Sequence, residues 1–112
     1  MLTKFQILRA GSETPEDREI ELDRQPGYHK LKALIEPLLD GKHFEHVAVL
    51  HNGGRRDMFV AEFSALDGSP RNEAATAIYR HNTLAREPGT DPESIPAIYG
   101  TAILFPDRPV WF

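Results

Sequence analysis

The chain has 112 residues, of which 40% are hydrophobic and none is cysteine, and its formal net charge is −4. This length suits one domain with a single core, and the lack of cysteine excludes disulfides, thiolate zinc sites and cysteine nucleophiles. The negative charge argues against general, charge-driven binding to nucleic acid, whose phosphates dominate affinity.

The first part of the chain predicts two strands. Residues 2–8 alternate imperfectly between apolar and polar side chains, as a half-buried strand does. Ile20 and Leu22 repeat the two-residue period between acidic residues, which indicates a short second strand with a charged outer face. Residues 9–17, between these segments, are polar and rich in turn-forming residues.

A helix is predicted over residues 28–39. Four aliphatic side chains stand at i, i+3, i+4 and i+7 and share one helical stripe: Leu31, Leu34, Ile35 and Leu38. Pro37 lies inside this pattern and lacks a backbone donor, so we expect the last turn to be kinked or unwound. Gly41 suits the left-handed conformation that ends many helices.

Residues 45–63 predict a β-hairpin. The run 45–51 is apolar at its central positions, a composition typical of a strand covered on both faces. The Asn-Gly-Gly segment at 52–54 tolerates positive φ, as a tight hairpin turn requires. Residues 58–63 are then the returning strand.

A turn and a second helix are predicted after the hairpin. Asp67 and Gly68 suit the turn, and Ser69 can cap the free amides of the helix. Pro70 suits the first helical position, because its missing donor costs nothing there. The alanine-rich sequence that follows extends the helix to about residue 81.

The last predicted element is a strand over residues 98–105, whose side chains alternate between two faces. Residues 86–96 contain three prolines and indicate a surface loop. The order strand, strand, helix, strand, strand, helix, strand favours the α+β class, with two helices packed on a largely antiparallel sheet of about five strands. We expect a single domain over residues 1–112 and leave the strand order and the oligomeric state open.

Four of these segments form a recognisable pattern. They are the helix at 31–39, the hairpin at 47–63, the stretch Asp67-Gly68-Ser69-Pro70-Arg71-Asn72-Glu73-Ala74-Ala75 and the glycine-containing strand at 98–104. Together, over about residues 28–105, they resemble a family of small proteins from bacteriophage and mobile-element genomes that is classed as a domain of unknown function. The resemblance implies a small intracellular protein of phage or prophage origin, and it implies no reaction.

Potential metal ligands are densest between residues 43 and 57: His43, Glu45, His46, His51 and Asp57. On a strand, His46 and His51 point to opposite faces, so they cannot chelate one ion directly. We interpret these residues as surface or strand-end histidines and predict no metal and no cofactor. A metal-dependent enzyme around His43, His46 and Glu62 is the third functional hypothesis, and whether the histidine group ever binds metal is left open.

The sequence shows no assembled catalytic group. None of its serines lies in the Gly-x-Ser-x-Gly motif that positions a nucleophile: Ser12, Ser64, Ser69 and Ser94. Glu62 and Glu73 are conceivable acid–base partners, but a polar strand face and a helix N-terminus account for them better. We therefore predict no catalytic residue and argue against an enzyme.

The Gly-Gly-Arg-Arg segment at 53–56 can present backbone amides and two guanidiniums to a phosphate. Arg55 and Arg56 are therefore candidate binding residues, although a solvated hairpin tip is the default interpretation. Arg71 and Arg80 extend this patch if the second helix lies beside the hairpin. The patch supports an alternative function, nucleic-acid or phosphate binding, without any standard nucleotide-binding motif.

Asn72 and Trp111 are the remaining candidate binding residues. Asn72 lies in the predicted first helical turn, where its amide can reach a ligand or lock the preceding turn, and we favour the structural role. Trp111 and Phe112 would fray into solvent unless they dock. They either complete the core or present a surface to a partner.

These observations favour a non-enzymatic interaction protein of phage or mobile-element type. We expect it to bind a macromolecule, with a protein as the expected partner, through its sheet edge, hairpin tip or aromatic tail. The longest uncharged apolar run, residues 96–106, is shorter than the roughly 20 residues of a membrane span, and the N-terminus lacks a signal-peptide cleavage site. We therefore expect a cytoplasmic protein that makes no membrane contact.

Overall fold

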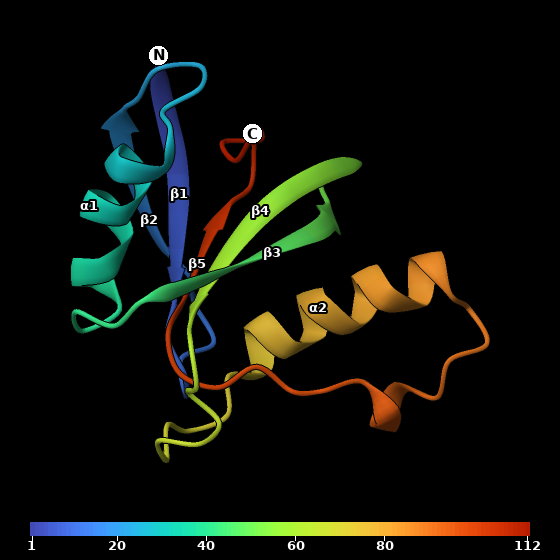
Figure 1. The fold of residues 1–112 in the computed structure, drawn as a ribbon. Coiled ribbons are helices and arrows are strands. Elements are labelled where there is room, and N and C mark those ends of the chain that lie inside the picture. The colour runs from blue at the N-terminus through green and yellow to red at the C-terminus, as the bar shows by residue number, and fades with distance from the viewer.

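The computed structural model describes residues 1–112 and contains five strands and two α-helices. In chain order they are β1 (Leu2–Leu8), β2 (Glu16–Glu21), α1 (Tyr28–Leu38), β3 (Phe44–His51), β4 (Gly54–Ala61), α2 (Glu73–Arg86) and β5 (Ala102–Phe105), with a 3₁₀ turn at Pro92–Ser94 before β5 (Figure 1). All strand pairs are antiparallel, in the order β2-β1-β5-β4-β3. The structure confirms the predicted α+β class, the element order and the sheet of five strands with two helices.

The two helices cover opposite faces of the sheet (Figure 1). Along β4, Phe59 packs in the core that contains Leu31 of α1, whereas Val60 packs in the core that contains Ala75 of α2. This division follows from the alternation of side chains along a strand. The central strand β5 serves both cores, and all of its side chains are buried: Ala102, Ile103, Leu104 and Phe105.

Helix α1 has the predicted position and ends one residue earlier than expected, at Leu38. Pro37 lies in its last turn, and the chain leaves the helix through two left-handed residues, Asp40 with φ 57° and Gly41 with φ 77°. The N–H of Gly41 donates to the carbonyl of Glu36 at 2.8 Å, which closes this end of the helix. No helix of the structure is both long enough and apolar enough to cross a membrane.

The hairpin of β3 and β4 turns through Asn52 and Gly53, whose φ values are 51° and 77°, as predicted. The returning strand begins at Gly54, four residues earlier than the predicted start at residue 58, and ends at Ala61. The prediction that β3 is covered on both faces is wrong, because Ala48 and Leu50 are exposed. β3 is an edge strand, and α1 covers it only near Phe44.

Helix α2 begins later than the sequence predicts, because Asn72 and not Ser69 is its N-cap. The N–H and Oγ–H of Ser69 both donate to Asp67 Oδ1, so this serine closes the turn. Pro70 stays outside the helix, since Arg71 forms a β-bridge with Tyr99. The helix continues to Arg86, five residues beyond its predicted end at residue 81.

The last strand is shorter than the predicted 98–105 and comprises only Ala102–Phe105. Gly100 has a φ of 77°, a conformation that breaks a strand. Its N–H donates to the carbonyl of Pro70 at 2.8 Å. The segment before β5 therefore pairs with the chain that leads into α2 and not with the sheet.

Candidate functional site

Asn72 is fully buried and holds three parts of the fold together. Its Oδ1 accepts a hydrogen bond from the N–H of Ala75 at 3.1 Å, and its Nδ2 donates to the carbonyls of Leu8 and Gly100, each at 2.8 Å. The amide thus joins the end of β1, the start of α2 and the segment before β5. Both amide hydrogens are engaged, so Asn72 has a structural role and has no donor available for a ligand.

At the hairpin tip, Arg56 is turned back onto the protein. Its Nε donates to the carbonyl of Pro106 at 2.7 Å, and its terminal nitrogens donate to the carbonyls of Arg55 and Asn52. Arg55 is about half exposed, with a terminal nitrogen 3.5 Å from Asp57 Oδ1. Only Arg55 of this pair is therefore available to an anionic ligand.

The other two candidate arginines have separate partners on and near α2. Arg71 forms an ion pair with Glu73 at 2.8 Å. Arg80 donates to the carbonyl of Ile95 at 3.3 Å and lies 3.8 Å from Glu93. Because each arginine is already engaged, nucleic-acid binding through a continuous patch has little support from these contacts.

Trp111 docks against the core that lies on the α1 side of the sheet. Its ring stacks on His46 at a centroid distance of 4.7 Å and an interplanar angle of 10°. The buried Asp57 fixes the backbone there, because Asp57 Oδ2 accepts hydrogen bonds from the N–H groups of Val110 at 2.7 Å and Trp111 at 3.1 Å. Of the two predicted roles of the aromatic tail, Trp111 therefore completes the core, while Phe112 is 71% exposed.

The histidines contact different carboxylates and do not converge on one point. His46 Nε2 is 2.7 Å from Asp57 Oδ1, whereas His43 Nδ1 is 2.9 Å from Glu36 Oε2. The structure does not bring three potential metal-ligating side chains together anywhere in the chain. The proposed group of His43, His46 and Glu62 is consequently not assembled.

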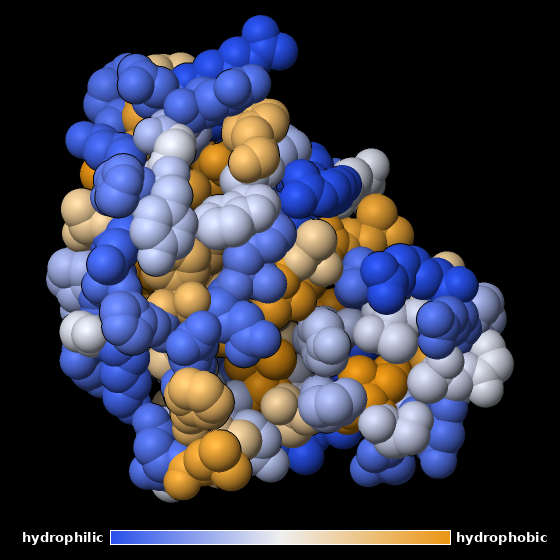
Figure 2. Space-filling model, viewed as in Figure 1, coloured by the Kyte–Doolittle hydropathy of each residue, from blue (hydrophilic) through white to orange (hydrophobic).

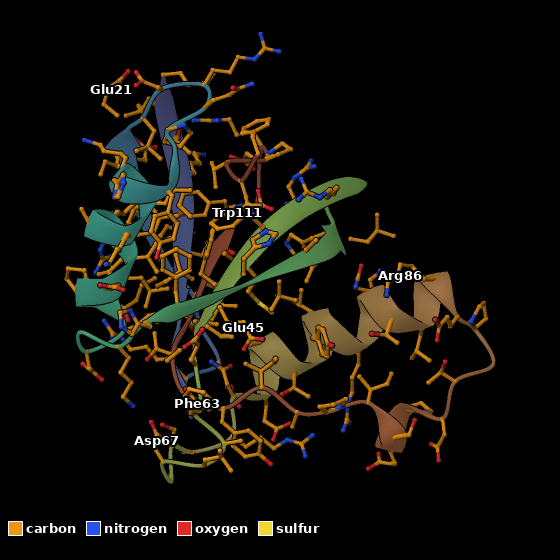
Figure 3. The ribbon with its side chains drawn as sticks, in the orientation of Figure 1. Glu21, Glu45, Phe63, Asp67, Arg86 and Trp111 are labelled. Carbon is orange, nitrogen blue, oxygen red and sulfur yellow. The ribbon has the colours of Figure 1, made fainter.

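The exposed feature that these contacts leave unexplained is the segment 62–69, which we name the apolar loop. Phe63 is 71% exposed and Leu66 is 83% exposed. Phe63 also has a φ of 59°, a left-handed conformation that is rare for a bulky residue. Figure 3 shows Phe63 and Asp67 together at the lower end of the molecule, where Figure 2 shows hydrophobic surface.

The apolar loop is held in place by several polar contacts. Lys42 Nζ lies 2.7 Å from Asp67 Oδ2, and the N–H and Oγ–H of Ser69 donate to Asp67 Oδ1 at 3.1 and 2.6 Å. The hydrogen bond from Lys42, followed by that from Ser69, lowers the pKa of Asp67 to about 2. The buried Ser64 adds a hydrogen bond from its Oγ to the carbonyl of Ala61 at 2.9 Å. The loop therefore presents Phe63 from a fixed backbone.

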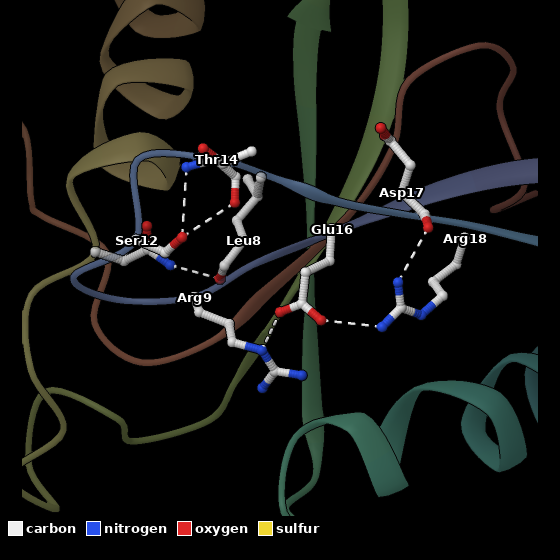
Figure 4. A network of polar contacts seen from close by, with 8 residues as sticks. Leu8, Arg9, Ser12, Thr14, Glu16, Asp17 and Arg18 are labelled. Atoms are coloured by element: carbon white, nitrogen blue, oxygen red, sulfur yellow. Dashed lines mark hydrogen bonds and ion pairs between the residues drawn. The ribbon is translucent and has the colours of Figure 1, made fainter.

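A polar cavity of about 200 Å³ lies beside the apolar loop, and Arg9, Lys42, Ser64 and Ser69 contribute to its wall. Arg9 forms an ion pair with Glu16, which also contacts Arg18 at 3.0 Å (Figure 4). Arg9 lowers the pKa of Glu16, and Glu16 raises the pKa of Arg9. These charges neutralise each other, so the cavity has no free cation to attract an anion.

Sequence patterns did not identify Phe63 and Leu66 as candidate binding residues. The sequence predicts Phe63 as the end of the returning strand at residues 58–63, and Leu66 directly precedes the predicted Asp-Gly turn. The available signal was the presence of two large apolar residues in a run otherwise rich in turn formers, residues 62–70. That signal does not show that the side chains point outward.

No family model, no curated protein and no solved structure matches this chain. The chemistry of the chain itself therefore has to identify its functional surface. That chemistry assigns Asn72, Arg56 and Trp111 to the fold, and it leaves the apolar loop as a fixed and exposed hydrophobic feature.

Proposed function

We propose that this chain is a non-enzymatic interaction protein that binds a protein partner through the apolar loop. The observation that carries this proposal is Phe63, an aromatic residue that is 71% exposed and has a φ of 59°. Backbone strain of this kind is found most often at functional positions. A residue kept in such a conformation, with its ring in water, contributes little to the fold and suits a contact with another molecule.

The energetics favour a partner with an apolar pocket. The left-handed conformation of a non-glycine residue costs roughly 1–2 kcal/mol, whereas burial of a Phe or Leu side chain stabilises by roughly 1.5–3 kcal/mol. The strain is already present in the unbound loop, so docking of Phe63 and Leu66 gains the burial free energy without incurring this strain again. The contacts of Lys42 and Ser69 with Asp67 reduce the ordering cost at binding, because the loop is already fixed.

A protein partner explains the loop better than a nucleic acid does. The most exposed side chains of the loop are apolar, and the chain has a net charge of −4. Phosphate recognition instead requires free cations, and Lys42, the cation that contacts the loop, is paired with Asp67. We extend the proposal to a cytoplasmic protein of phage or mobile-element origin, which the resemblance of residues 28–105 and the absence of cysteine support.

The test is a quantitative capture of partners from the source cell with tagged wild-type protein and two loop variants, Phe63→Asn and Leu66→Ser. We expect a protein that copurifies in a constant ratio with the wild type and is depleted at least about 10-fold by either variant, as for interface anchors. The matched control is Leu2→Ser, which removes an apolar side chain that is 66% exposed on β1.

Retention of the same partner by all three variants would contradict the proposal, as would loss with Leu2→Ser alone. Specific turnover of a substrate that depends on one polar cluster would also contradict it. Circular dichroism of each variant establishes that a lost partner reflects the altered surface and not unfolding.

A further inference from the structure

We propose a second binding site, at the outer edge of β3, that takes an extended acidic peptide. In this site the peptide backbone pairs with β3 as an added strand, and a peptide carboxylate binds to Asn82 and Arg86. The site is separate from the apolar loop and does not depend on the function proposed for it.

A hollow of about 330 Å³ lies between the end of β3 and the C-terminal half of α2. Its wall consists of Ala48, Val49, Leu50, Arg55, Asn82 and Arg86. Asn82 and Arg86 are one helical turn apart, so both project from the same side of α2. Figure 3 shows Arg86 on the part of α2 that lies toward the hairpin end of β3.

Asn82 and Arg86 present hydrogen-bond donors to this hollow, whereas the Arg55 side chain is on the same face of the sheet as Asp57, opposite α2. Arg86 forms no ion pair, and Arg55 is about half exposed with only a 3.5 Å contact to Asp57. Asn82 is only 7% exposed, and its Oδ1 accepts the N–H of Leu50 at 2.9 Å, which leaves its NH₂ group without a protein partner. No acidic side chain lines the hollow. The Arg86 guanidinium and the amide donor of Asn82 are suited to an oxyanion.

The edge of β3 identifies the rest of the ligand as a peptide. The N–H of Leu50 points outward, because it donates to Asn82. Ladder groups alternate along a strand, so the N–H groups of Ala48 and His46 also point outward, where β3 has no neighbouring strand. An extended peptide supplies donors and acceptors at the matching spacing, whereas a free phosphate is too small to span several residues of the strand.

The position of Asn82 determines where the added strand ends. Its side chain already occupies the N–H of Leu50, so pairing can extend over residues 44–48 and must stop there. The next residue of the peptide then lies beside Asn82 and Arg86. The exposed apolar side chains of Ala48 and Leu50 provide contact surface beside it. This arrangement favours an acidic residue at the end of a short apolar strand.

The experiment is an NMR titration of the ¹⁵N-labelled protein with three probes. The first is an acetylated Val/Thr peptide that ends in Glu-Asp, the second is the same peptide with Gln-Asn and an amidated C-terminus, and the third is inorganic phosphate. We expect the acidic peptide to shift the amides of residues 44–50 and the Arg86 side chain, and to bind at least about 10-fold more tightly than the neutral peptide. Phosphate is expected to shift the Arg86 side chain weakly and to leave His46 and Ala48 unchanged.

Two protein variants separate the two parts of the site. Arg86→Gln should lower the affinity for the acidic peptide about 10-fold and leave the neutral peptide unaffected. Ala48→Pro removes an outward N–H without removing a bond of the β3–β4 ladder, and should abolish strand pairing. If Ala48→Pro does not fold, a peptide N-methylated along its pairing edge tests the same hydrogen bonds with unaltered protein.

Several results would overturn the proposal. They are equal affinity for the acidic and neutral peptides, phosphate binding as tight as peptide binding, and full affinity of the N-methylated peptide. Sedimentation as a dimer that buries residues 44–50 would assign the edge to a second copy of the chain instead. Phe63→Asn should leave the titration unchanged, so failure here and failure of the apolar loop can be distinguished.

Discussion

The apolar loop and the C-terminal tail each bring an aromatic residue to the margin of the sheet, and an aspartate holds each segment. In the tail, the buried Asp57 accepts the backbone N–H of Trp111, and the ring stacks inward on His46. In the loop, Asp67 bonds Lys42 near the surface, and the ring of Phe63 stays 71% exposed. Trp111, whose backbone is held by a buried carboxylate, thus completes the core. Phe63, whose loop is held by a carboxylate near the surface, keeps its ring available for a partner.

The largest expected effect is at the buried aspartate. Asp57→Ala leaves the N–H groups of Val110 and Trp111 without their acceptor and should lower the free energy of unfolding by about 3 kcal/mol. Denaturant unfolding measures the loss, and release of the tail should shift the emission of Trp111, the only tryptophan, to longer wavelength. Asp67→Ala is the matched change in the loop and should have a much smaller effect. Equal losses in the two variants would remove the distinction between the segments.

Removal of the Trp111 ring should lower the free energy of unfolding less than removal of the Asp57 carboxylate does. Trp111→Ala should destabilise by about 2 kcal/mol, since the ring packs against the core but is only partly buried. Phe112→Ala is the neighbouring control and should change stability by less than about 0.5 kcal/mol, because that side chain is 71% exposed. Thermal unfolding of both variants decides whether Trp111 belongs to the core; an unchanged melting temperature for Trp111→Ala would exclude it.

Substitution of Phe63 should change the stability in the opposite direction to substitution of Trp111. Phe63→Gly relieves a φ of 59° and should stabilise the protein by about 1 kcal/mol while it weakens partner binding. Such a gain in stability at the expense of function is typical of strained functional positions. Leu66→Ser should weaken binding with no gain in stability, because Leu66 does not have a positive φ. A destabilised Phe63→Gly protein would show that the ring supports the fold.

The smallest expected effect is on the ionisation of Asp67, which bonds Lys42 and Ser69 in the apolar loop. The folded pKa of Asp67 is lowered from 3.8 to about 2, so its contribution to stability is present above about pH 4 and is lost as the pH falls toward 2. Lys42→Met removes the first cause of this shift and should bring the pKa back toward 3.8. An NMR titration of the Asp67 carboxyl carbon measures both values. A wild-type pKa near 3.8 would mean that Lys42 does not fasten the loop in solution.

Local patterns were sufficient for much of the fold. The stripe from Leu31 to Leu38 predicted α1, and the Asn-Gly pair at 52–53 predicted the hairpin turn, because each depends on neighbouring residues only. The predicted start of α2 was wrong because of a contact with a distant part of the chain. Ser69 and Pro70 fit a helix start by composition, but the bridge between Arg71 and Tyr99 keeps this segment extended.

The candidate residues illustrate the same limit. Asn72 was an ambiguous residue in the sequence, and its role became clear only through Leu8, 64 residues away, and Gly100. By sequence, Arg56 suits a phosphate. In the structure, it instead donates to the carbonyl of Pro106. A polar side chain is free or engaged according to partners that sequence spacing does not reveal.

The sequence by itself determined the α+β class, the positions of α1 and of the β3–β4 hairpin, and the absence of cysteine chemistry, because composition and short-range periodicity govern them. Only the tertiary structure decided that β3 lies at the edge, that Trp111 turns inward and that Phe63 turns outward. Those outcomes depend on hydrogen bonds and burial between distant segments, such as Asp57 with the tail and Lys42 with the loop. The surfaces proposed for binding are therefore products of long-range packing around a locally encoded framework.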